Sequence, residues 1–292
     1  MANNKIKIRL QGHEKFVLRD GWLSKGLINV EKDPHVFQGK EGPDIFGIGN
    51  NMVKSLRYWM KAFGLIVEKQ GKGSLLTNIG QIIYDNDVYI EDMFTVWVLH
   101  SNIVKNIEEA TSWYMFFNKC DIEDMDKDQI EKILIRELHN YALETKFSEK
   151  SAKNDLDVLL NMYTKTIEED DPEDKRDSLF AKLNLIKNVE GRIFKTSPYR
   201  TKISEWNILY ELAEYFDAND DKFISIEKLL SGVNGIERIY NISSILSNEL
   251  LDKLDTAGFI KVDRTAGLDM IYKVKDFTVE SVLKEYYEKI GK

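Results

Sequence analysis

Four residues whose side chains take part in hydrolytic chemistry lie close together near the N-terminus: His13, Glu14, Arg19 and Asp20. An imidazole and a carboxylate can hold a divalent metal, Mg²⁺ or Mn²⁺, that activates water for phosphodiester cleavage, and a guanidinium can stabilise the charge that develops. The two carboxylates stand six residues apart, a spacing that does not define a metal site. The alternative is a buried network of these side chains that braces the fold.

A second group of side chains has the types that bind DNA. Amides can pair with adenine at its base edge, and lysine or arginine can bind guanine or a phosphate. We therefore predict base contacts for the two asparagines and phosphate contacts for the cations, with double-stranded DNA as the partner. The alternative is a solvated helix face that docks onto another protein. The residues of this group are Asn50, Asn51, Lys54, Arg57, Lys61 and Lys72.

The elements that must position this group can be predicted from apolar spacing and glycine placement. The spacing from Asn50 to Phe63 predicts a helix with one buried stripe, and a short helix and a tight glycine turn precede it. Residues 65–77 predict a β-hairpin with a glycine turn. Helix, turn, helix and a two-stranded wing is the order of a winged helix-turn-helix, so we predict such a module over residues 1–85.

The C-terminal part repeats this order. Apolar spacing predicts helices over 204–216 and 241–257, followed by a second hairpin and a last helix that Thr278 caps. Residues 222–275 hold 8 Lys/Arg against 7 Asp/Glu, which does not favour phosphate binding. We predict a second winged helix-turn-helix over 204–292 that serves in homodimerisation or in docking a partner protein.

The middle of the chain, residues 86–170, is predicted to be helical. An acidic block without apolar residues, 168–177, marks a linker, and we place a linker and a connecting helix over 171–203. The predicted fold class is thus mainly α, with N-terminal and C-terminal winged helix-turn-helix modules joined by a helical middle and carrying two small β-hairpin wings.

Composition limits the class of protein. The net charge of −8 is unevenly spread: residues 1–80 hold 13 Lys/Arg against 7 Asp/Glu, and the remainder holds 28 against 42. Because salt screens charges beyond about 10 Å, the local balance matters more than the total, and the basic end is the candidate DNA face. Such a split also arises by chance. The single cysteine, Cys120, allows no internal disulfide, and the most apolar stretch, 93–104, is too short to span a bilayer, so we expect a soluble cytoplasmic protein.

Two further patterns have structural interpretations. Residues 217–229 place Asp217, Asn219 and Asp221 where a calcium loop has ligands, but Lys222 stands at the glycine position and Lys228 at the final glutamate position. We therefore expect a loop between helices without calcium. His100 follows an apolar run, which favours a core histidine over a metal ligand.

Four segments together resemble a bacterial family known only as a domain of unknown function, number four thousand and seven. They are GHEKFVLRDGWLSKG (12–26), GIGNNMVKSLRYW (47–59) with AFGLI after it, IEDMFTVWVLH (90–100) and WYMFFN (113–118). His13, Glu14, Arg19 and Trp22 match the first motif, and Gly49, Asn51, Met52, Arg57, Tyr58 and Trp59 match the second. The family pattern often has lysine where Asn50 stands here, so a phosphate contact implied by the resemblance does not carry over to this position.

The resemblance implies a role in DNA phosphorothioation, the replacement of a non-bridging phosphate oxygen by sulfur. Family members are encoded beside a cysteine desulfurase and an ATP-pyrophosphatase-like sulfurtransferase, which become expected partners. One branch is similar to the nicking subunit of single-strand phosphorothioation defence systems, which implies nicking with a divalent metal. We thus expect a DNA-binding subunit of such an anti-phage system; the alternatives are a non-enzymatic transcription regulator and a protein-bridging adaptor.

Overall fold

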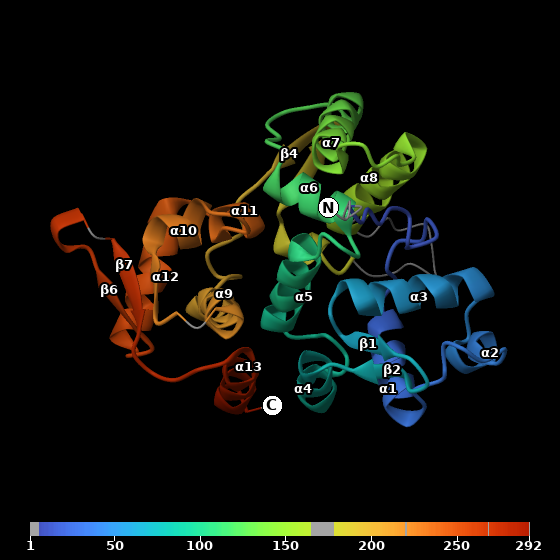
Figure 1. Ribbon diagram of the computed structural model, residues 1–292, viewed down its shortest axis with the longest axis horizontal. Helices are drawn as coiled ribbons and strands as arrows, with labels where there is room; N and C mark the ends of the chain where they lie inside the picture. The colour runs from blue at the N-terminus through green and yellow to red at the C-terminus, as the bar shows by residue number, and fades with distance from the viewer. Residues whose placement is uncertain (1–5, 165–177, 220, 268, 292) are drawn as a thin grey trace, which may run out of the picture.

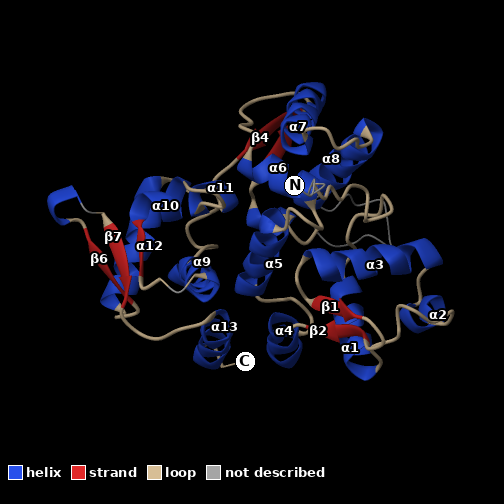
Figure 2. Ribbon diagram, viewed as in Figure 1, coloured by secondary structure: helices blue, strands red, loops and turns tan. Residues whose placement is uncertain are grey.

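The computed structural model describes residues 6–164, 178–219, 221–267 and 269–291 of the 292-residue chain (Figure 1). Helices predominate, and the short strands form small separate sheets (Figure 2). The helices are α1 (Trp22–Lys32), α2 (Gly42–Phe46), α3 (Asn50–Ala62), α4 (Asn78–Asp87), α5 (Met93–Lys105), α6 (Thr111–Asn118), α7 (Lys127–Ala142), α8 (Glu149–Thr164), α9 (Glu205–Ala218), α10 (Ile226–Ser231), α11 (Ile236–Ile239), α12 (Ser244–Thr256) and α13 (Val279–Lys289). The strands are β1 (Ile66–Lys69), β2 (Gly73–Leu76), β3 (Ile186–Val189), β4 (Arg192–Lys195), β5 (Phe223–Ser225), β6 (Ile260–Asp263) and β7 (Met270–Lys273).

The N-terminal unit contains α1 to α4 and the hairpin β1–β2. Gly47, in the left-handed conformation, ends α2, and Gly49 starts α3 in extended conformation. After α3 the chain turns at Gly64, also at positive φ, into the antiparallel hairpin. The turn of this hairpin lies against the α1–α2 loop, because the amide of Ser74 donates to the carbonyl of Pro34 at 2.7 Å. A Cβ on Gly73 would lie 2.3 Å from the same carbonyl oxygen, so this approach requires glycine.

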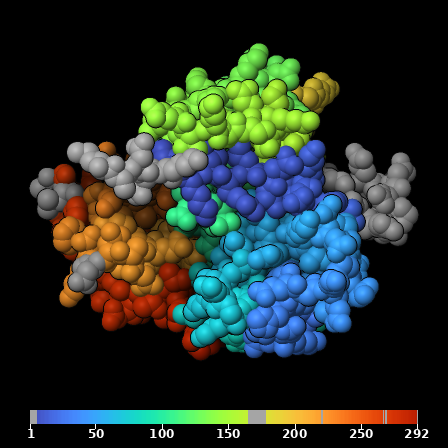
Figure 3. All heavy atoms as spheres, turned by 45° about the vertical axis from the view of Figure 1, so that its right-hand side comes forward, coloured from blue at the N-terminus to red at the C-terminus, as the bar shows by residue number. Residues whose placement is uncertain are grey.

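The middle of the chain is built on α5, which is buried on nearly all sides. The helices α6, α7 and α8 pack in succession beside it, and the hairpin β3–β4 joins them through a bridge between Met125 and Ile193. Segment 6–20 runs without regular secondary structure for most of its length between these helices and the N-terminal unit. Figure 3 shows it as a dark-blue band between the yellow-green of α8 and the lighter blue of α3.

The C-terminal unit contains α9 to α13 and the three-stranded antiparallel sheet β5–β7–β6. Its last helix, α13, packs against α9 of its own unit and against α4 of the N-terminal unit (Figure 1). Thr278 caps α13 with a capping box. The hydroxyl of Tyr287 on α13 shares a 2.7 Å hydrogen bond with Thr95 on α5, so the end of the chain is tied to the middle.

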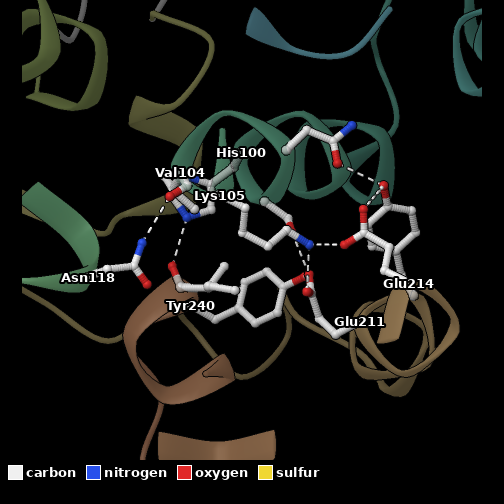
Figure 4. A network of polar contacts seen from close by, with 11 residues as sticks. His100, Val104, Lys105, Asn118, Glu211, Glu214 and Tyr240 are labelled. Atoms are coloured by element: carbon white, nitrogen blue, oxygen red, sulfur yellow. Dashed lines mark hydrogen bonds and ion pairs between the residues drawn. The ribbon is translucent and has the colours of Figure 1, made fainter. Parts of the chain in front are cut away.

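A buried polar network joins α5 to α9 and α11 (Figure 4). The carboxylate of Glu211 accepts hydrogen bonds from Lys105 at 2.7 Å and from Ser101 and Tyr240, each at 2.5 Å. Lys105 is also paired with Glu214. His100 lies nearby, wholly buried, between the Tyr163 hydroxyl at 2.6 Å and the Ile239 carbonyl at 2.8 Å. These polar groups satisfy one another inside the shared core.

Most predicted elements of the two ends exist, and the middle differs in detail. Within the region predicted to be helical, α5 begins at Met93, because Asp92 caps it by accepting from the amide of Phe94. The region 171–203, expected as a linker and a connecting helix, holds the hairpin β3–β4 and a short 3-10 turn, and its part up to 177 lies outside the described residues. The described chain therefore has three small sheets where two wings were predicted.

The mainly helical fold class is confirmed. Residues 6–10 have no regular secondary structure, and residues 1–5 lie outside the described part. Across the described ranges, no helix combines the length and apolar character needed to cross a membrane.

Candidate nucleic-acid-binding site

The helix α3 separates its apolar residues from its polar ones. Leu56, Trp59 and Met60 are wholly buried in the core. Asn51 and Lys54 are exposed on the opposite side, where the Lys54 ammonium donates to the Asn51 side-chain oxygen at 3.2 Å. This division follows from the helical spacing of the two residue types, and it leaves one polar stripe of α3 in contact with solvent. The side chains on or beside this stripe are Asn50, Asn51, Lys54, Arg57 and Lys61.

A cavity of about 270 Å³ runs along this stripe, and we call it the α3 groove. Segment 6–20 forms one wall of the groove, and the hairpin β1–β2 contributes Glu68. The groove combines Glu14 of the first predicted group with three predicted DNA-binding cations. Its lining residues are Arg9, Gly12, Glu14, Lys54, Arg57, Tyr58, Lys61, Glu68 and Glu109.

Carboxylates already bind two of the groove's cations. Glu68 is ion-paired with Arg57, and its other oxygen lies 3.7 Å from the ammonium of Lys61. Glu109 lies 3.6 Å from Lys61 and 3.1 Å from Lys7. The hydrogen bond from Arg57 is the main reason that the pKa of Glu68 is lowered, so this carboxylate is ionised at neutral pH. Sequence reasoning missed the part played by Arg9, Glu68 and Glu109, because only the fold brings them to α3.

His13 lies outside the groove, in the core. Its Nδ1 accepts from the amide of Lys15 at 3.1 Å, so Nε2 carries the proton and donates to Asp155 at 2.8 Å. The imidazole stacks on Trp59 with the ring centroids 5.6 Å apart. Asp155 also accepts from the hydroxyl of Ser112 and the amide of Gln11, each at 2.7 Å. This arrangement braces segment 6–20 against α3, α6 and α8 and exposes no imidazole nitrogen for chemistry.

The other members of the first predicted group are dispersed. Glu14 lines the α3 groove, whereas Arg19 and Asp20 line a second, smaller pocket of about 30 Å³ at the start of α1. Within the described ranges, no three histidine, cysteine, aspartate or glutamate side chains lie close enough together to hold a metal ion. The four residues therefore form no single site.

Three members of the DNA-binding group do not line the groove: Asn50, Asn51 and Lys72. The two asparagines are exposed at the start of α3. Lys72 is exposed in the hairpin turn, between two glycines at positive φ. The group is therefore partly gathered on α3, with Lys72 on a separate element.

The calcium-like segment is occupied by internal contacts. Asp217 accepts from the amide of Val279 at 2.8 Å, and Asp221 accepts from the hydroxyl of Tyr215 at the same distance. The amide of the Asn219 side chain donates to the carbonyl of Tyr215. These bonds point the three side chains toward different partners.

Comparison with known proteins identifies the family. A family profile described as "Protein of unknown function (DUF4007)" matches residues 10–287, which is nearly the whole chain. The chain belongs to the DUF4007 family. The fold of this DUF4007 protein is similar to two solved structures, "Magnesium ion-bound SspB crystal structure" and "SspB crystal structure". The TM-scores are 0.83 and 0.82, each at 23% identity over 97% of this chain and 88% of the other. No curated protein matches the sequence.

Proposed function

We propose that this DUF4007 protein is a DNA-binding component of a DNA phosphorothioation or related anti-phage modification system, and that α3 is its DNA-binding helix. The observation that supports this proposal is the convergence of Arg9, Lys54, Arg57 and Lys61 on one groove. Phosphate contacts of lysine and arginine supply most of the affinity in protein–DNA complexes. The similarity to the SspB structures is consistent with this assignment.

The arrangement of elements supports two winged helix-turn-helix modules. In the N-terminal unit, α1, α2 and α3 are followed by the hairpin β1–β2. In the C-terminal unit, α9, β5, α10 and α12 precede β6 and β7. In such modules the helix before the hairpin enters the major groove. The exposed asparagines at the start of α3 would then face base edges, and Lys72 in the hairpin turn would contact a neighbouring phosphate.

The C-terminal unit differs in the chemistry of its corresponding helix. On α12, Asp252 is paired with Arg264 at 2.8 Å and Glu249 with Arg200 at 2.9 Å. Ile245, on the same helix, is 68% exposed. A carboxylate-rich helix with an exposed apolar side chain suits a protein contact better than a phosphate contact. We therefore propose this surface for homodimerisation or for docking the desulfurase and sulfurtransferase subunits, and expect Ile245→Asp to abolish the contact in sedimentation experiments.

The experiment that tests DNA binding is a titration of labelled duplex with wild-type protein, Lys54→Ala, Arg57→Ala and the double variant. Each replacement is expected to weaken binding about tenfold at low salt and to reduce the salt slope by about 1. Lys222→Ala, an exposed lysine of the C-terminal unit, is the matched control. Equal binding by all variants would remove α3 as the DNA-binding helix. Absence of binding by the wild type, with co-purification of neighbouring subunits, would favour the protein-bridging adaptor.

Metal-dependent nicking has weaker support. One similar solved structure is described as magnesium-bound. In this chain Glu68 and Glu109 are engaged by cations, and the described residues gather no cluster of metal ligands. The described residues therefore offer no set of three side-chain ligands for a resident Mg²⁺ or Mn²⁺ ion. Relaxation of supercoiled plasmid with either metal, lost in Glu14→Ala, would be required to assign this activity.

A further inference from the structure

We propose that Glu68 and Glu109 occupy, in the free protein, the places that DNA phosphates take on α3, and that they make the groove selective for a continuous phosphodiester backbone. This inference rests on the proposed DNA-binding function and adds the regulation of the same site. The carboxylates compete with phosphate for the same cations, so a ligand must offer enough phosphates to displace both.

Glu68 contacts two of the predicted phosphate-binding cations, Arg57 and Lys61. One carboxylate oxygen accepts from Nε of Arg57, and the other faces the ammonium of Lys61 at 3.7 Å. The Glu68 side chain is 28% exposed and belongs to β1, whose pairing with β2 fixes its position beside α3. Both cations therefore have a resident anion that the hairpin holds in place.

Glu109 approaches Lys61 from the other direction. It belongs to the loop before α6, and its amide donates to the side chain of Asn106 at 3.1 Å, which fixes the backbone. One oxygen lies 3.6 Å from Lys61, and the other accepts from Lys7 at 3.1 Å. Two carboxylates from separate elements thus bracket one lysine. Lys54, by contrast, bonds the neutral Asn51, so its charge is the one on α3 most available to a first phosphate.

The spacing of the cations defines the ligand. Lys54 and Lys61 are seven residues apart, about 10 Å along a helix axis, which is the rise of about three nucleotides of one DNA strand. Arg57 uses Nε for Glu68, so its terminal nitrogens remain available. A single phosphate ion that approaches Lys61 is repelled by the carboxylates of Glu68 and Glu109. A DNA strand offers consecutive phosphates. One phosphate binds Lys54 first, and further phosphates then replace the carboxylates of Glu68 and Glu109 on Arg57 and Lys61.

The test compares wild-type protein with Glu68→Gln, Glu109→Gln and the double variant. The matched control is Glu227→Gln, an exposed glutamate on α10, which lies at the other end of the molecule from α3 (Figure 1). The probes are a non-specific duplex of about 20 base pairs and inorganic phosphate, each at about 50 and 200 mM salt. We expect each site variant to bind duplex about five- to tenfold more tightly at the lower salt, with a steeper salt slope by about 1.

Inorganic phosphate is expected to bind the double variant and to be excluded from the wild type. Unchanged or weaker duplex binding by both single variants, with unchanged thermal melting, would overturn the inference, since the carboxylates would then only position Arg57 and Lys61. An equal gain in Glu227→Gln would also overturn it, because the effect would be one of net charge alone. Wild-type binding that depends on Lys54 and Arg57 would leave the proposed function standing in either case. If no variant bound DNA, both proposals would fail.

Discussion

His13 donates a hydrogen bond of 2.8 Å from Nε2 to the carboxylate of Asp155, a residue 142 positions further along the chain. Both side chains are almost fully buried. The bond fixes segment 6–20, which carries Arg9 and Glu14, against α8. The shape of the α3 groove therefore depends on an interaction made outside it.

Removing the Asp155 carboxylate is expected to destabilise the protein strongly. In Asp155→Ala, the donors of His13, Ser112 and Gln11 lose their partner in the interior, and the expected loss is about 3 kcal/mol of unfolding free energy. Urea denaturation followed by circular dichroism measures it. Asp157→Ala, on the same helix but half-exposed, is the control, with an expected change below about 1 kcal/mol. Equal losses in the two variants would contradict the bracing role.

A methyl group on Gly12 is expected to displace segment 6–20. The added Cβ would lie 2.3 Å from the buried ring of Tyr58, so either this ring or segment 6–20 must shift. We expect Gly12→Ala to cost about 1–3 kcal/mol of stability and to weaken DNA binding in the same variant, because Gly12 and Tyr58 both line the groove. Gly39→Ala, where the added Cβ would make only an ordinary contact of 3.8 Å with the amide nitrogen of Glu41, should leave both properties unchanged.

Stability is expected to fall in mild acid because of His100. Burial lowers the pKa of this imidazole from 6.5 to about 3, so between these values the unfolded chain takes up a proton that the folded protein does not. Stability from this group is complete above pH 6.5 and declines as the pH falls toward 3, by about 2 kcal/mol at pH 5. His100→Gln, which can keep one donor and one acceptor, should have a flatter dependence. Parallel pH profiles for the two proteins would contradict this assignment.

Replacing Lys105 is expected to weaken the polar network between α5 and α9 and to lower the free energy of unfolding. In Lys105→Met, the Glu211 carboxylate stays inside without its cation, at an expected cost of about 3 kcal/mol. The double variant Lys105→Met/Glu211→Leu should recover part of this loss, because the buried carboxylate of Glu211 is then removed together with its cation, and the remaining partner, Glu214, is 31% exposed. A double-mutant cycle by urea denaturation measures the coupling, and strictly additive losses would show that the two side chains do not interact.

The ends of the chain could be predicted from sequence because their signals are local. Glycines 47, 49 and 64 bound α3, and the apolar stripe around Trp59 is helical in period, so the observed helix ends within one residue of the prediction. The hairpin β3–β4 was missed, although Glu190 and Gly191 form a tight turn with both φ angles positive. The acidic block 168–177 led to the prediction of a linker and a connecting helix over 171–203. The short strands β3 and β4, which follow this block, were therefore not predicted.

The candidate site could be predicted only in part for a related reason. Lys54, Arg57 and Lys61 share one helix, so their spacing places them on one face without any knowledge of the fold. Glu109 reaches them from the loop before α6, and no local pattern indicates that approach. The predicted grouping of His13 with Glu14 rested on their being neighbours in sequence. In the structure the His13 side chain lies in the core, whereas Glu14 lines the groove.

The packing of α13 against both α4 and α9 has a geometric consequence. Through α13 the two units share one contact region, which sets where the surface on α12 lies relative to α3. In the proposed arrangement, a partner protein docked on α12 would therefore lie at a defined offset from DNA bound at α3.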